Sequence, residues 1–133
     1  MFEESFPMFP GNERLIGLRD VLSMVPVGEF NWYVLTFDGM GKAPDNLSME
    51  EFEAKIADSS DGYSVSWEGL LKFSDGLEQT FDCVIVGVGR NVVIDRRRVL
   101  NGDYTSCEVV IDAFDSSEWK ICSQQPIARS NMI

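Results

Sequence analysis

The chain has 133 residues, of which 44% are hydrophobic and 25% charged, a composition typical of one globular domain and not of a disordered chain. Its 22 Asp and Glu against 11 Lys and Arg give a formal net charge of -11, which disfavours binding to nucleic acid or to anionic membranes. The absence of histidine excludes Ser-His-Asp and Cys-His catalytic systems and metal sites that require imidazole.

The first third of the chain predicts an arm, a helix and a strand. Two prolines and a glycine indicate an irregular arm over residues 1–11. Residues 12–24 carry apolar side chains at helical spacing, with Asn12 as the cap. Residues 31–39 are apolar on both faces, which indicates a strand inside a sheet. Strict alternation puts Trp32, Val34 and Thr36 on one face and Tyr33, Leu35 and Phe37 on the other.

The middle of the chain begins with a clear helix signal. Ser48 and Glu51 form a capping box, in which the hydroxyl accepts from a backbone N–H and the glutamate reaches back to the cap. Residues 63–81 fit either a hairpin or a short strand followed by a helix that starts at Ser66 and ends at Gly76. We adopt the strand and helix.

The last third is rich in strand patterns. Residues 81–89, 105–115 and 118–124 each predict a strand, and residues 92–100 predict either another strand or an exposed loop. Residues 125–133 are expected to be a loose end.

Strands that follow helices in this way indicate an α+β fold. We expect a single domain over residues 1–133, with a mostly antiparallel sheet of about five strands and two or three helices packed on one face.

Cysteine usage and the absence of targeting signals predict a cytoplasmic protein. Cys83, Cys107 and Cys122 lie in apolar or alternating runs without a Cys-x-x-Cys motif, so we expect buried, reduced thiols. The first residues carry acids where a signal peptide needs positive charge, and no apolar run is long enough to span a membrane.

Two Glu-x-Lys triplets resemble part of a metal-dependent nuclease motif. In the first, Glu53 and Lys55 lie within the expected helix and point about 200° apart, so they cannot converge on one ion. The second, Glu118 and Lys120, lies on an expected strand, but short triplets arise readily in an acidic chain. We therefore expect no catalysis, no metal and no cofactor.

The strongest candidate for a binding surface is acidic. Six acids between residues 45 and 61 accompany one base, Lys55. They are Asp45, Glu50, Glu51, Glu53, Asp58 and Asp61. Such a surface attracts basic protein partners, although helix capping and solubility would use the same residues.

Three consecutive arginines, Arg96, Arg97 and Arg98, stand out against this acidic background. They could form an anion-binding patch or half of a contact between two copies of the chain. We favour the simpler interpretation, a solvated charged segment.

Two segments, residues 19–39 and 109–124, resemble parts of the immunity proteins encoded beside bacterial polymorphic and contact-dependent toxins. The resemblance implies a small, acidic, cytoplasmic, non-enzymatic protein that binds a toxin and occludes its active site. No functional residues follow from the resemblance, because such proteins share no fixed toxin-contact motif.

The leading hypothesis is therefore an acidic binding protein that neutralises a basic protein partner. The alternative is an adaptor domain that self-associates as a homodimer, through a sheet edge or the arginine segment.

Overall fold

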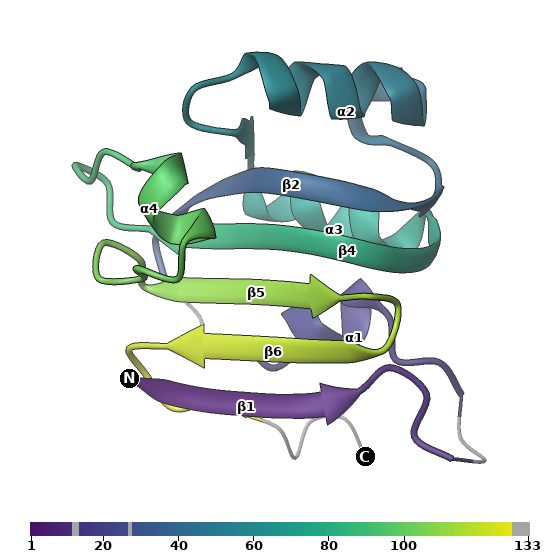
Figure 1. Ribbon diagram of the computed structural model, residues 1–133, viewed down its shortest axis with the longest axis horizontal. Helices are drawn as coiled ribbons and strands as arrows, with labels where there is room; N and C mark the ends of the chain where they lie inside the picture. The colour runs from purple at the N-terminus through teal and green to yellow at the C-terminus, as the bar shows by residue number, and fades with distance from the viewer. Residues whose placement is uncertain (12–13, 27, 129–133) are drawn as a thin grey trace.

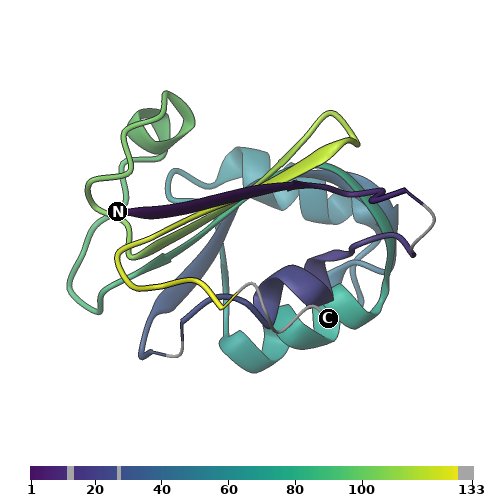
Figure 2. The ribbon, with the colours of Figure 1, turned by 90° about the horizontal axis from the view of Figure 1, so that it is seen from below.

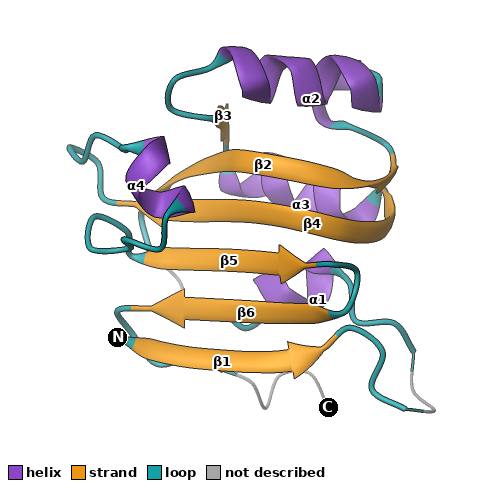
Figure 3. Ribbon diagram, in the orientation of Figure 1, coloured by secondary structure: helices purple, strands orange, loops and turns teal. Residues whose placement is uncertain are grey.

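The computed structural model describes residues 1–11, 14–26 and 28–128, which form a six-stranded sheet with helices around it (Figure 1, Figure 3). The strands are β1 (Phe2–Pro7), β2 (Asn31–Gly41), β3 (Tyr63–Val65), β4 (Leu77–Val88), β5 (Val109–Phe114) and β6 (Glu118–Ser123). The helices are α1 (Leu18–Leu22), α2 (Met49–Asp58), α3 (Trp67–Asp75) and α4 (Arg96–Leu100), with a 3-10 turn, η1, at Pro44–Asn46.

The predicted α+β class with an antiparallel sheet is confirmed. The described residues contain six strands where about five are predicted, and four helices where two or three are predicted. The strand order is β1-β6-β5-β4-β2-β3, with every neighbouring pair antiparallel. Strands β4 to β6 are consecutive neighbours, whereas β1 and β3 form the two edges.

The main core lies between the sheet and three helices. Figure 2 shows α1 and α3 on one side of the sheet, and Figure 1 shows α2 alongside β2. The helices contribute Leu18, Val21, Phe52, Ile56, Leu70 and Phe73 to this core. They pack on inward side chains of the strands, including Trp32, Val34, Ile85, Ile111, Trp119 and Ile121.

The opposite face of the sheet has a second, smaller core under α4. Ile94 and Val99 from this segment pack with Cys107 on Leu35, Val86, Val88, Val110 and Cys122. Neither alternative predicted for residues 92–100, a strand or an exposed loop, describes residues 96–100, which form a helix. Instead, the Asp95 carboxylate caps a short helix by accepting from the backbone N–H of Arg98 at 3.2 Å. Three helices, α1, α2 and α3, pack on one face of the sheet as predicted, whereas α4 packs on the opposite face.

A bulge in β2 reverses which side chains of its second half point into the main core. Val34 pairs with Ile85 but Thr36 pairs with Val84, so Leu35 is an extra residue in the ladder. Phe37 consequently lies in the main core together with Val34, not on the opposite face with Leu35 as strict alternation predicts.

The irregular arm predicted over residues 1–11 is wrong for residues 2–7, which form the edge strand β1, whereas residues 8–11 have no regular secondary structure. This strand pairs with β6 in a register that sets Phe6 opposite Trp119. Phe6 and Met8 are buried, and the Met8 N–H donates to the carbonyl of Ser117 at 2.8 Å. Pairing with β6, which lies more than a hundred residues later in the chain, therefore holds this segment extended.

The first helix is shorter than predicted. Residues 14–17 are not helical, and α1 begins only at Leu18; the predicted cap, Asn12, lies outside the described residues. The Ile16 N–H donates to the Met8 carbonyl, and the Ile16 carbonyl accepts from the Trp119 indole, each at 2.8 Å. These tertiary bonds keep residue 16 extended.

The middle of the chain agrees with the prediction of a short strand followed by a helix. Ser66 caps α3 by accepting from the Gly69 N–H at 3.0 Å, and Gly76 ends the helix. The next strand, β4, starts at Leu77, four residues earlier than predicted.

The C-terminal end is anchored as far as residue 128. Ile127 packs against the main core, and the Ala128 N–H donates to the Met24 carbonyl at 2.9 Å. The loose end predicted over residues 125–133 is thus contradicted at these positions, and residues 129–133 lie outside the described part.

Candidate functional site

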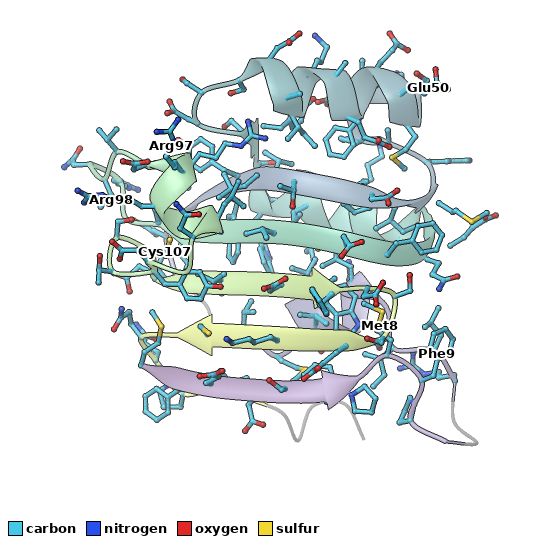
Figure 4. All side chains as sticks on the ribbon, in the orientation of Figure 1. Met8, Phe9, Glu50, Arg97, Arg98 and Cys107 are labelled. Atoms are coloured by element: carbon cyan, nitrogen blue, oxygen red, sulfur yellow. The ribbon has the colours of Figure 1, made fainter. Side chains whose placement is uncertain are left out.

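Four of the six predicted binding acids lie on one helix. Glu50, Glu51, Glu53 and Asp58 belong to α2 and are exposed. Asp45 lies in η1 before this helix and Asp61 in the loop after it, and both are exposed as well. We call these six side chains the α2 acidic surface. Figure 4 labels one of them, Glu50, near the start of α2.

Helix geometry separates the acids of α2 from its buried side. Phe52 and Ile56 face the main core and are 0% and 3% exposed. At 100° per residue, Glu50 and Asp58 project from the side opposite this pair. Because they are eight residues apart, they lie about 12 Å from each other along the helix axis. The acidic surface is therefore elongated and not a single cluster.

Two of the six acids have structural partners. Glu51 accepts from the Ser48 N–H at 3.0 Å while Ser48 Oγ accepts from the Glu51 N–H at 3.1 Å, which confirms the predicted capping box. The backbone N–H of Ser48 lowers the pKa of the Glu51 carboxyl. Asp45 accepts a hydrogen bond from the Tyr63 hydroxyl. Burial, and next this hydrogen bond, raise the pKa of Tyr63 to about 12.

None of the six acids forms a salt bridge within the described residues. Five ion pairs are present there, and all involve other carboxylates. They are Arg14–Asp20, Arg19–Asp75, Arg90–Glu29, Arg98–Asp95 and Lys120–Glu3. The charge of the α2 acidic surface is thus left largely uncompensated by cations of the described chain.

The three arginines have different surroundings. Arg96 is half-buried, and its Nη1 donates to the carbonyls of Ile56 at 2.8 Å and Ser59 at 2.7 Å. These carbonyls lie at the C-terminal end of α2, so the guanidinium caps that helix and ties α4 to it. Arg97 and Arg98 are exposed on α4 (Figure 4). The solvated segment favoured from the sequence therefore describes Arg97 and Arg98 but not Arg96.

Replacing Arg96 by alanine is expected to lower the free energy of unfolding by about 2 kcal/mol, because two charge-assisted hydrogen bonds to backbone carbonyls are lost. Urea denaturation measures the change, and amide hydrogen exchange at the end of α2 localises it. Arg97→Ala is the matched control, and its effect should stay within about 0.5 kcal/mol. Equal effects of the two substitutions would contradict a capping role for Arg96.

A second group of carboxylates lies on the sheet face opposite the main core and was missed from the sequence. Asp38 and Asp82 are directly opposite each other on β2 and β4. Asp112 on β5 is half-buried, and burial raises the pKa of its carboxyl, an effect that Lys120 opposes and Asp82 adds to. Like charges facing each other across a ladder are unfavourable. The sequence signal that could have revealed this group is that each of the three aspartates occupies an outward position of an alternating strand pattern.

The cysteines are buried and free. Burial raises the pKa of the thiols of Cys83, Cys107 and Cys122, which keeps them protonated and poorly nucleophilic. Across residues 1–11, 14–26 and 28–128, no three Asp, Glu, Cys or His side chains are grouped to hold a metal ion. None of the helices in these ranges has the length and apolar character needed to cross a membrane.

Comparison of the chain with protein-family models, with curated protein sequences and with solved structures finds no match.

Proposed function

We propose that this chain is a non-enzymatic binding protein that neutralises a basic protein, most simply a toxin, by covering the active site of that protein with the α2 acidic surface. The proposal places the complex in the cytoplasm, where the three cysteines stay reduced. It agrees with the resemblance of two segments to immunity proteins.

One observation carries the proposal: the α2 acidic surface is exposed and forms no salt bridge with the described cations of its own chain. Carboxylates without a salt bridge inside the chain are available to a partner's lysines and arginines. The formal net charge of -11 adds a long-range field that speeds the approach of a basic surface.

The mechanism would be steered association followed by occlusion. A toxin that acts on nucleic acid must bind phosphate groups with basic side chains. Carboxylates spread over about 12 Å, the axial separation of Glu50 and Asp58, can occupy more than one such phosphate position. The helix holds them in fixed spacing because Phe52 and Ile56 are anchored in the core.

The test uses a variant that removes charge without removing the cap. Glu50→Gln, Glu53→Gln and Asp58→Asn together leave Glu51 in place. A basic partner is first captured with the tagged native chain at low salt, with neighbouring gene products supplied. We expect the triple variant to associate with it roughly tenfold more slowly at low salt, because steering is lost. Stopped-flow association at increasing salt measures this effect.

The control changes the same number of charges elsewhere. The control variant combines Glu78→Gln on β4, Asp115→Asn in the turn between β5 and β6, and Glu118→Gln on β6. These three acids are exposed, and the control variant has the same net charge as the test variant. It should keep most of the native association rate. Equal slowing by both variants would show that net charge acts and the α2 acidic surface does not. Recovery of the chain alone, with light scattering showing a dimer, would favour self-association instead.

A further inference from the structure

A pocket of about 630 Å³ opens between α3 and the segment that joins β2 to α2. One wall is the segment from Lys42 through η1, and the other is the face of α3 from Ser66 to Gly76. The pocket lining includes the two lysines Lys42 and Lys72, one from each wall. Its volume falls in the range of small-molecule sites in proteins.

The backbone brings the two lysines to the same place. The Lys42 N–H donates to the Gly76 carbonyl at 2.9 Å, and a β-carbon at Gly76 would lie 3.2 Å from the Lys42 β-carbon. Gly76 follows Lys72 by four residues, which is one helical turn and about 6 Å along the axis. Both long side chains can therefore reach one group bound between them.

These lysines also lack counter-ions in the described chain. Neither Lys42 nor Lys72 takes part in any of the five salt bridges of the described residues. Asp75, which could pair with Lys72 on the same helix, instead pairs with Arg19 at 3.6 Å. Two ammonium groups without a salt-bridge partner in the described residues therefore lie beside one pocket.

The rest of the lining supplies neutral donors and one acceptor. Asn46, Ser64 and Ser66 contribute amide and hydroxyl groups. The Ser66 oxygen accepts from the Gly69 N–H at 3.0 Å, which leaves its own proton free to donate. Asp45 lies at the same pocket with its carboxylate bonded to Tyr63, and it can accept from a ligand hydroxyl. The pocket thus offers charge to an anion and hydrogen bonds to a polar body.

We propose that this pocket binds a small organic oxyanion, a phosphate monoester or a carboxylate that also carries hydroxyl groups, with Lys42 and Lys72 as the anion-binding side chains. Lysine binds phosphate and carboxylate as a compact charge with rotatable donors. The pocket shares Asp45 with the α2 acidic surface, but its two anion-binding lysines lie outside that surface. Its test needs no protein partner, so the pocket proposal stands or falls independently of the proposed function.

The experiment titrates the isotope-labelled chain with glycerol phosphate and, in a parallel arm, with glycerate, at constant ionic strength set with chloride. We expect saturating amide shifts at Ser64, Gly69 and Gly76 with a dissociation constant of about 1 mM or below in at least one arm. The arm with the tighter constant identifies the phosphate or the carboxylate. Small shifts that do not saturate in either arm would overturn the proposal.

The variant Lys42→Met with Lys72→Met should weaken binding at least tenfold. The matched control is Lys55→Met with Arg97→Met, which removes two other exposed cations that form no salt bridge within the described residues. We expect the control to bind within twofold of the native chain. Equal weakening in both variants would show that binding depends on the overall charge of the chain and would overturn the proposed site. Lys72→Arg, which keeps the charge, should retain binding.

Discussion

Replacing Trp119 by alanine is expected to destabilise the fold by about 4 kcal/mol, a large share of the total stability of a small domain. Trp119 is 0% exposed, and it faces Phe6 of β1 and Ala113 of β5 on its two sides. Its indole N–H donates to the Ile16 carbonyl at 2.8 Å. The substitution therefore opens a cavity in the main core and also releases the segment that leads into α1. Urea denaturation followed by circular dichroism measures the loss.

Two further variants separate the contributions of Trp119. Trp119→Phe keeps most of the apolar volume but leaves the Ile16 carbonyl without its donor, so we expect a loss of about 2 kcal/mol. Phe114→Ala, at a side chain 64% exposed, should change stability by no more than about 0.5 kcal/mol. A loss below about 1 kcal/mol for Trp119→Ala would contradict its central place in the core.

The elements that could be predicted are those whose signals are local. The start of α2 is set by Ser48 and Glu51, and the start of α3 by Ser66, all within one helical turn. Strands β5 and β6 are joined by a short turn at residues 115–117, so their pairing is also visible in the local pattern. Caps and tight turns need no knowledge of the rest of the chain.

The errors arose where distant residues decide the conformation. Residues 2–7 have little strand pattern, yet β6 supplies a ladder for them. Ile16 lies in a segment whose apolar spacing is helical, but its backbone is hydrogen-bonded to Met8 and to the Trp119 side chain. In β2, a single bulge at Leu35 reverses the face of Phe37, and no residue type announces it. Tertiary pairing overrides local propensity at each of these positions.

The same division applies to the candidate sites. The α2 acidic surface could be found from the sequence because its members lie within 17 residues and four share one helix. The cap that Arg96 places on α2 joins residues 37 and 40 positions apart, so no motif contains it. Lys42 and Lys72 are also brought together only by the fold, through the bond from Lys42 to Gly76.

Phe52 links the fold to the proposed function. Its ring is 0% exposed and lies 5.8 Å from the ring of Phe37, 5.1 Å from that of Tyr63 and 5.2 Å from that of Phe73. Phe52 of α2 thus contacts aromatic side chains of β2, β3 and α3. Tyr63 of β3 also donates a hydrogen bond to Asp45, which connects η1 to the same group of side chains. Without the Phe52 ring, α2 keeps its cap but loses most of its anchor on the main core.

Phe52→Ala is expected to cost about 4 kcal/mol and to loosen α2 before the rest of the sheet. Amide exchange should therefore rise first in residues 49–58, and association with a basic partner should fall even under conditions where β4 to β6 remain protected. Phe52→Leu, which keeps an apolar anchor, should retain most of both properties. For the variant that neutralises Glu50, Glu53 and Asp58 we expect a different result, in which the stability of α2 is kept and only the association with the basic partner is slowed. If Phe52→Ala binds a basic partner at the native rate while exchange in α2 is fast, then an ordered α2 is not needed for binding, and the acidic surface does not act through the fixed spacing of a helix.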